Sequence, residues 1–396
     1  MTDGARPLHV LMLLNSCYPP PEGGGTQAQV RVLAKALQMR GHKVTVVAPL
    51  TDTRTQRRVE RIDGVPICRL DFPPIHLIGT AWLLTRLSLF RLQRRNRYDA
   101  WHVHSPRLFA AVAALIGSAL RKPAVVVKVA SALELELGTL SVNPSMRSRV
   151  QYLCLKRADA WQAISHRIAE GIEATGIPAH RIAAIPNAVD TVRFCPTAKA
   201  PVAGSTRFIF IGRLVEVKCL PLLLQAFATL LQSHPRSHLR IVGTGPLEDA
   251  LKQECLTLGI ADRVEFAGYC GQVERLIADA DVGVLPSSTE GLSNTLLECM
   301  ASGLPMIASR VSGSEDLVRP DGNGWLFEPG DMGGLVRCLG EAATLSPQQR
   351  LQLGCEARAT IEGHASLDSV LERLVALYRG TAPPVRQPTI VASEVH

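Results

Sequence analysis

Two glutamates, Glu290 and Glu298, stand eight residues apart in the segment PSSTEGLSNTLLE, which follows an apolar run. Eight residues are just over two helical turns, so a loop Glu290 and a helical Glu298 can reach opposite ends of one elongated ligand. Four backbone N–H groups between them would open the helix and form an anion site at the positive end of its dipole. They belong to Gly291, Leu292, Ser293 and Asn294. The alternative is an ordinary helix start with acidic residues near its first turn.

A second candidate group follows another apolar run, in the segment GRLVEVK. Arg213 offers a fixed bidentate fork for phosphate, and Lys218 offers a mobile point charge. Five residues apart after a strand, both could converge on one diphosphate. The alternative for such a pair is two solvated surface cations.

Glycines mark two further places where backbone could approach a ligand. Gly243 and Gly245, in VGTGP, directly follow an apolar run, where they allow either a tight turn or a close approach. Gly23, Gly24 and Gly25 precede a predicted helix, whose N-terminus could face a phosphate or a sugar.

These groups require elements to position them, and short apolar runs alternate with amphipathic stretches as in parallel βαβ units. We expect strands of a first sheet at 9–14, 43–48, 101–104, 125–129 and 160–164. We expect strands of a second sheet at 208–211, 239–242, 264–266, 282–285 and 306–308. The main helices are expected at 26–40, 220–232, 293–302 and 367–379. In such sheets, ligands bind beyond the carboxyl ends of the strands.

A polar segment around 196–206 is expected to link two domains. The first domain is predicted at 1–199 and the second at 200–366, both Rossmann-like. A C-terminal helix over 367–380 is expected to pack back near the first domain, followed by a mobile tail over 381–396.

Composition narrows the class of protein. The 396 residues are 46% hydrophobic and 20% charged, as in globular proteins, and the ten cysteines form no CxxC pair, which argues against a zinc ribbon or a disulfide framework. We find no signal peptide and no transmembrane run in the sequence, so we expect a cytoplasmic protein.

Taken together, the motifs resemble those of the retaining glycosyltransferase family 4, over about residues 8–380. The matching segments are Gly23–Gly25, Gly212-Arg213-Leu214 with Lys218, Gly243–Pro246 and the E-x7-E block that runs on to Pro305. The resemblance implies a GT-B fold, in which two Rossmann-like doubly wound domains face each other across a cleft. It makes the first domain the acceptor domain and the second the nucleotide-sugar donor domain.

The resemblance also implies site roles. Arg213 and Lys218 would hold the donor diphosphate and stabilise the charge that grows on it. Glu290 would lie by the donor sugar, near the N–H groups of residues 291–294, and Glu298 would accept hydrogen bonds from the ribose hydroxyls. Two glycine pairs would complete the donor site, one shaping the nucleotide pocket and one facing the diphosphate. These pairs are Gly243 with Gly245, and Gly24 with Gly25.

The implied activity is sugar transfer with retention from a UDP- or GDP-sugar to a glycan, lipid-linked or small-molecule acceptor. No metal and no other cofactor is expected, because the cations and helix dipole can take the place of a divalent ion. Two alternatives stay open: a nucleotide-sugar epimerase of the same fold, and a catalytically silent protein that binds a nucleotide-sugar.

The sequence departs from the family pattern at two positions. Ala130 stands where many relatives carry a histidine near donor sugar or acceptor, which motivates the silent alternative. Cys219 follows Lys218 where a glycine is frequent. His102 and His104, at period two on a predicted strand, are interpreted as buried and hydrogen-bonded structural histidines.

Charge is uneven along the chain. Residues 1–199 hold 27 Lys/Arg and 13 Asp/Glu, and residues 200–396 hold 16 and 22. The segment 75–98 contains five arginines and no acid, so it is either an ordinary amphipathic helix or a helix at an anionic membrane surface. A peripheral location on the inner face of a membrane is therefore open. No motif supports nucleic-acid binding.

Overall fold

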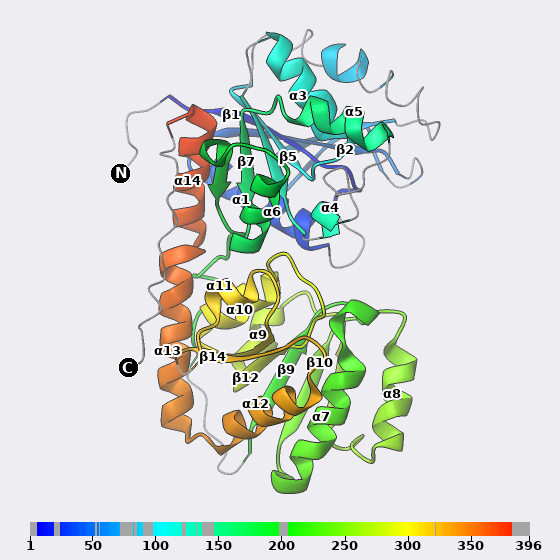
Figure 1. Cartoon of the computed structure of the whole chain (residues 1–396), viewed down its shortest axis with the longest axis vertical. Helices are drawn as coiled ribbons and strands as arrows, with labels where there is room; N and C mark the ends of the chain where they lie inside the picture. The colour runs from blue at the N-terminus through cyan, green and yellow to red at the C-terminus, as the bar shows by residue number, and fades with distance from the viewer. Residues whose placement is uncertain are drawn as a thin grey trace. The chain divides into compact units, whose positions relative to one another are not determined.

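Two compact units make up the chain. The computed structural model describes residues 6–19, 24–51, 54, 56–71, 82, 85–89, 98–120, 124–131, 133–136, 146–197, 205–320 and 322–381. Unit 1 comprises Met1–Tyr18, Leu37–Ile185 and Glu372–His396, and unit 2 comprises Pro19–Ala36 and Pro186–Leu371 (Figure 1). Of the predicted linker, residues 198–204 lie outside the described part, as does the predicted tail beyond Thr381.

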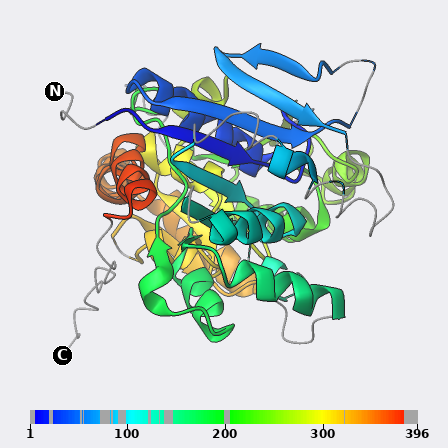
Figure 2. The ribbon, with the colours of Figure 1, turned by 90° about the horizontal axis from the view of Figure 1, so that it is seen from above.

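Unit 1 is built on a sheet of eight described strands in the order β3-β4-β2-β1-β5-β6-β7-β8. All neighbours are parallel except the hairpin of β3 and β4 at one edge, drawn in light blue in Figure 2. The strands are β1 (His9–Leu13), β2 (Lys43–Pro49), β3 (Val59–Ile62), β4 (Val65–Leu70), β5 (Ala100–His104), β6 (Ala124–Val129), β7 (Ala160–Ala163) and β8 (Ile182–Ala184). The helices of unit 1 are α3 (Leu108–Leu120), α4 (Leu133–Glu136), α5 (Met146–Leu155), α6 (His166–Ala174) and the short 3-10 helix η1 (Ala179–Arg181). Two helices belong in part to each unit: α1 (Gly25–Met39) is in unit 2 up to Ala36, and α14 (Leu367–Arg379) is in unit 2 up to Leu371.

Unit 2 is built on a second sheet, whose six described strands are all parallel in the order β11-β10-β9-β12-β13-β14. Its strands are β9 (Arg207–Ile211), β10 (His238–Val242), β11 (Val264–Gly268), β12 (Val282–Leu285), β13 (Met306–Ser309) and β14 (Gly324–Phe327). Its helices are the 3-10 helix η2 (Glu216–Lys218), α7 (Leu220–Ser233), α8 (Glu248–Thr257), α9 (Val273–Ala278), α10 (Asn294–Ala301), α11 (Ser314–Leu317), α12 (Met332–Thr344) and α13 (Pro347–His364).

Continuous apolar runs explain why the strands lie at the centre of each unit. β12 is buried at all four positions and β9 at four of five, as expected for parallel strands covered on both faces. Phe208 of β9 meets Phe227 of α7 edge to face, with ring centroids 6.2 Å apart, and α7 packs against α12. The prediction of two doubly wound α/β domains is confirmed.

A row of buried polar side chains crosses the centre of the first sheet. His104, Lys128 and Gln162 are neighbours in register on β5, β6 and β7, and each is at most 2% exposed. His102 is also buried, and its Nδ1 lies 2.7 Å from the hydroxyl of Tyr378 on α14. The predicted structural role is therefore confirmed for His102. His104 is buried as predicted, but neither of its ring nitrogens has a hydrogen-bond partner in the described part.

Burial shifts the protonation of this row. It lowers the pKa of Lys128 from 10.5 to about 7, although the nearby Glu134 carboxylate acts in the opposite direction. It lowers the pKa of His102 to about 3, with the charge of Lys128 contributing in the same direction. Desolvation thus disfavours the charged forms of His102, His104 and Lys128.

Lys128 should make the stability of the protein depend on alkaline pH. Between its folded pKa of about 7 and its ordinary 10.5, the unfolded chain binds a proton that the folded chain does not, so stability rises with pH across this window. Lys128→Met should therefore raise the melting temperature at neutral pH, and this gain should shrink as the pH approaches 10.5. Thermal unfolding between pH 7 and pH 10.5 measures this gain in melting temperature. Lys252→Met, at an exposed position of α8, is the control. A gain that does not change with pH would contradict the shifted pKa.

Candidate functional site

The second sheet reverses its winding direction between β9 and β12. From β9 the chain adds β10 and β11 on one side, whereas from β12 it adds β13 and β14 on the other. At such a switch point the loops after the two central strands diverge and leave room for a ligand. The predicted motifs with Lys218 and Glu290 follow β9 and β12, so both lie at this edge.

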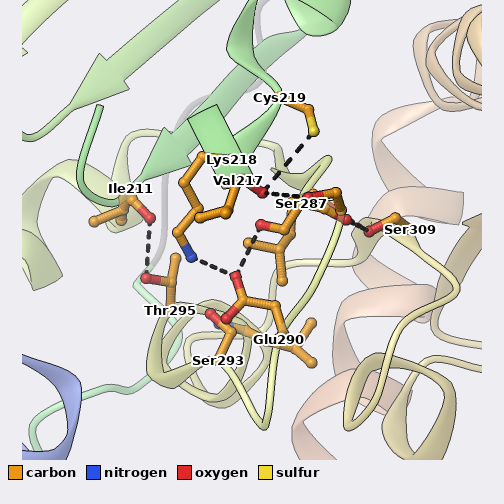
Figure 3. Close-up of polar contacts among 12 residues, drawn as sticks. Ile211, Val217, Lys218, Cys219, Ser287, Glu290, Ser293, Thr295 and Ser309 are labelled. Atoms are coloured by element: carbon orange, nitrogen blue, oxygen red, sulfur yellow. Dashed lines mark hydrogen bonds and ion pairs between the residues drawn. The ribbon is translucent and has the colours of Figure 1, made fainter. Parts of the chain in front are cut away.

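Lys218 and Glu290 form a direct ion pair across the switch point (Figure 3). Their side chains are only 16% and 14% exposed, so the two charges interact in partly desolvated surroundings. The Ser287 hydroxyl donates to the same Glu290 oxygen at 2.8 Å. Ser288 donates its backbone N–H to the carbonyl of Val217 at 2.9 Å, which joins the two loops next to the pair.

The glycines after β10 permit close packing between neighbouring loops. A Cβ on Gly243 would lie 2.0 Å from the carbonyl oxygen of Gly212, and φ at Gly243 is +132°. A Cβ on Gly245 would lie 2.4 Å from the carbonyl oxygen of Leu214, whose N–H donates to the carbonyl of Thr244 at 2.9 Å. These two glycines therefore fix the position of the loop that carries Arg213 and Lys218.

Helix α10 begins at the same edge. Its N-cap is Ser293, whose hydroxyl accepts the N–H of Leu296 at 3.4 Å. Within the described residues, the N–H groups of 291–294 donate to no protein acceptor. The predicted anion-binding donors are thus available, and Thr295 ties the helix to β9 through the carbonyl of Ile211 at 3.1 Å.

An amide network holds the side chain of Asn294. Its Oδ1 accepts from Gln29 and from Asn187, both at 3.1 Å, and its Nδ2 donates to the carbonyl of Gly25 at 3.2 Å. Gln29 and Asn187 are buried. The network brings Gly25, the first residue of α1, to the start of α10, with Gly24 next to it. Gly23 lies outside the described residues.

Glu298 lies on α10 in an environment that sequence spacing did not reveal. Burial raises the pKa of its carboxyl to about 7, the charge of Glu274 adds to the shift, and that of Arg193 opposes it. Arg193 donates to Glu274 at 2.8 Å and to the carbonyl of Gly271 at 3.3 Å. The hydrogen bond from Arg193 lowers the pKa of Glu274. Arg193 therefore stabilises the Glu274 carboxylate by a hydrogen bond and the Glu298 carboxylate by its positive charge.

Two other residues stand out at this edge. Arg213 is exposed and has no side-chain partner in the described part of the chain, so its guanidinium is available to a ligand. Tyr269, which the sequence analysis missed, is 66% exposed directly after β11. Gly268 links it to the site, since its carbonyl accepts the N–H of Gly243 at 2.8 Å. Tyr269 could have been predicted as a site residue, because an aromatic residue directly follows Gly268 at the end of a strand.

Cys219 adopts the left-handed backbone conformation, with φ +49° and ψ +40°. This conformation costs a residue with a Cβ about 1 kcal/mol more than it costs glycine. The geometry explains why glycine suits the position after Lys218, and it identifies cysteine there as a tolerated local strain.

In unit 1, the carboxyl ends of β5 and β6 are joined by Glu134. One of its oxygens accepts the Ser105 hydroxyl at 2.6 Å, and the other accepts the N–H of Ala130 at 2.9 Å. The backbone at Ala130 is therefore held in place, although the residue has no imidazole to offer.

Two family profiles match complementary parts of the chain. The profile described as glycosyl transferases group 1 matches residues 205–344, and the one described as a glycosyl transferase 4-like domain matches residues 24–188. Both matched regions are therefore similar to glycosyl transferases. The switch-point edge described above lies in the first of the two matched regions.

Individual curated glycosyltransferases align with this chain over part of their length. The putative colanic acid biosynthesis glycosyltransferase WcaL of Escherichia coli K12 is 31% identical over 229 residues, 56% of this chain and 56% of WcaL. The lipopolysaccharide core biosynthesis glycosyltransferase LpsE of Rhizobium meliloti is 32% identical over 190 residues, which cover 48% of this chain and 53% of LpsE. This chain thus aligns with about half the length of each relative.

A solved GT-B structure matches nearly the whole chain. Anabaena HepE, crystallised in complex with UDP, superposes with a TM-score of 0.77 over 94% of this chain and 100% of its own, at 20% identity. The predicted GT-B fold with two Rossmann-like domains is confirmed by this likeness.

If Glu298 binds the ribose hydroxyls, as the resemblance implies, donor binding should depend on pH. Only the ionised carboxylate accepts two hydroxyl hydrogen bonds, and its pKa is about 7. Affinity for UDP-glucose, whose diphosphate does not titrate in this range, should rise by about tenfold from pH 6 to pH 8. Glu298→Gln should remove that dependence, whereas Glu341→Gln, at an exposed position of α12, should keep it. Isothermal titration checks both, and an unchanged pH profile in Glu298→Gln would refute the role of Glu298.

Proposed function

We propose that this chain is a retaining hexosyltransferase that moves a sugar from a UDP- or GDP-sugar to a glycan, lipid-linked or small-molecule acceptor. The observation that carries the proposal is the meeting of the Lys218 ammonium, the Glu290 carboxylate and the N–H groups of 291–294 at the switch point. The names of WcaL and LpsE, which concern glycan assembly, and the UDP bound to HepE support it.

The donor diphosphate would lie between the loop after β9 and the start of α10. Lys218 would exchange its contact with Glu290 for the phosphate oxygens, and the exposed Arg213 would add a bidentate contact. Both cations would stabilise the charge that grows on the diphosphate as the glycosidic bond breaks. Gly24 and Gly25 would face the diphosphate at the N-terminus of α1.

The two glutamates would divide the rest of the donor between them. Glu290, with the Ser287 hydroxyl fixing its orientation, would accept hydrogen bonds from the sugar hydroxyls. Glu298 would accept the ribose hydroxyls, and the loop with Gly243 and Gly245 would shape the nucleotide pocket. Tyr269 would offer its ring to the base.

Retention would follow from attack on the face that the diphosphate leaves. The transition state would resemble an oxocarbenium ion, as in glycoside hydrolysis, and the departing phosphate would help to deprotonate the acceptor. Two cations and a helix N-terminus supply the electrostatic stabilisation at the phosphate, so we propose that no divalent metal is required. NMR of the product would report the anomeric configuration.

A panel of UDP-, GDP- and ADP-sugars tests the proposal, with thermal shift and hydrolysis measured with and without EDTA. One base class should raise the melting temperature and undergo slow hydrolysis that EDTA does not change. No stabilisation by any nucleotide-sugar would overturn the donor site, and loss of turnover in EDTA would overturn metal independence.

Lys218→Met should lower turnover by about a hundredfold, because it removes a cation that acts on the charge developing in the transition state. Binding of the free nucleoside should change much less, since a nucleoside has no phosphate. Lys252→Met removes a lysine from the same unit outside the site and should leave both quantities unchanged. Equal turnover in Lys218→Met and the parent protein would exclude the assigned role.

A silent nucleotide-sugar-binding protein is the second candidate, and Ala130 is the observation that favours it. The position at the end of β6 offers only a backbone N–H, which Glu134 already binds. Stabilisation by a donor without turnover over a panel of acceptors would support this candidate, whereas turnover with any acceptor would exclude it.

We further propose that the protein works on the cytoplasmic side, at an anionic membrane surface that its basic N-terminal half contacts. In the described part of the chain no helix is both long and apolar enough to cross a membrane. Of the arginine-rich segment 75–98, only Trp82, Thr85–Leu89 and Tyr98 are described, so the surface helix predicted there lies largely outside the described residues.

A further inference from the structure

Helix α5 of unit 1 carries an exposed apolar stripe. Met146, Val150 and Leu153 are 75%, 56% and 64% exposed. Their spacing of four and three residues places them on one face of the helix, about two turns long. Three large apolar side chains in a row on a solvent-facing helix cost free energy unless something covers them.

The opposite face of α5 holds the helix to the protein. Leu155 is fully buried, Ser148 and Gln151 are partly buried, and the helix packs against α3. The apolar stripe is therefore not the face that anchors α5 to its own unit.

Cations flank this stripe without acids between them. Arg149, Lys156 and Arg157 are exposed, and Arg181 lies beside them, since its guanidinium donates to the carbonyl of Lys156 at 3.1 Å. The sequence has no Asp or Glu from residue 137 to residue 158. The next acid, Asp159, accepts the backbone N–H of Val125 at 2.7 Å.

We infer that α5 is a docking helix for an anionic lipid surface. The apolar stripe would enter the boundary between headgroups and acyl chains, while Arg149, Lys156 and Arg157 would contact lipid phosphates. Charge complementarity selects this occupant, because the described charged residues within α5 and directly after it, Arg149, Lys156 and Arg157, are all positive and exposed. The inference deepens the proposed function and rests on it in one respect: a lipid-linked acceptor would be met at this surface.

Cosedimentation of the full-length protein with lipid vesicles tests the inference. The protein should bind vesicles of phosphatidylglycerol and phosphatidylcholine in equal parts at low salt, and bind pure phosphatidylcholine vesicles far more weakly. Leu153→Asp should weaken binding to the anionic vesicles by about tenfold or more, since it removes apolar surface and adds a negative charge. Lys156→Glu should weaken it by about fivefold or more.

Matched controls come from unit 2. Leu351 on α13 has the same 64% exposure as Leu153, so Leu351→Asp should bind vesicles as the parent protein does. Arg236 is exposed outside unit 1, and Arg236→Glu should likewise retain binding. Each variant should keep the melting temperature of the parent protein, which excludes unfolding as the cause of a loss.

Failure of this inference can be told apart from failure of the proposed function. No binding of the parent protein to anionic vesicles, or equal losses in Leu153→Asp and Leu351→Asp, would overturn the docking helix. The thermal shift by UDP-glucose in solution should be the same in Leu153→Asp and the parent protein, because α5 lies in a different unit from the donor site. An absent shift in both would count against the donor site alone.

Discussion

The ion pair between Lys218 and Glu290 is the contact on which the proposed donor site depends. It joins the loop after β9 to the loop after β12, the two strands between which the sheet changes its winding direction. Because both side chains are mostly buried, removing either partner would leave the other charge poorly solvated. The nearby Ser287 is fixed in turn by Ser309 of β13, whose hydroxyl donates to the Ser287 carbonyl at 2.5 Å. β13 therefore helps to position the Lys218–Glu290 ion pair, although it contributes neither of the two charges.

Buried polar and charged side chains lie in different places in the two units. In unit 2, charges lie at the sheet edge and are satisfied by one another or left open to a ligand, as with Lys218 and Arg213. In unit 1, Lys128 and His104 lie inside the sheet, where burial lowers their pKa values. The ring nitrogens of His104, which have no hydrogen-bond partner among the described residues, also cost stability. Unit 1 also carries its charge outside, as the basic surface of α5. The proposed donor site thus lies at the edge of one sheet, and the proposed membrane contact lies on a helix of the other unit.

Much of the fold follows from local patterns in the sequence, and the exceptions have clear causes. Short apolar runs identified the strands β1, β2, β5, β6 and β7 and all of the second sheet except β14, whose four residues include a leading glycine. The hairpin of β3 and β4 was missed because its strands are short and partly polar. The Asp63-Gly64 pair could have predicted this hairpin, because Asp-Gly is typical of a tight turn between antiparallel strands. Both residues have positive φ in the structure, as such a turn requires.

The positions of Lys218 and Glu290 at one edge could be predicted, because carboxyl ends of parallel strands share an edge. Their direct pairing could not, since it depends on the side-chain conformations of residues 72 positions apart. The same holds for Arg193 and Glu274 beside Glu298, and for the amide network around Asn294. Spacing along the chain reports which residues share an element, whereas these contacts join elements that are distant in sequence.

A structure of the protein with UDP bound would test the central claim most directly. We expect the diphosphate within hydrogen-bonding distance of the Lys218 ammonium and the N–H groups of residues 291–294, with the ribose hydroxyls on Glu298. Nucleotide bound elsewhere, or bound at the switch point with no phosphate contact from Lys218, would contradict it.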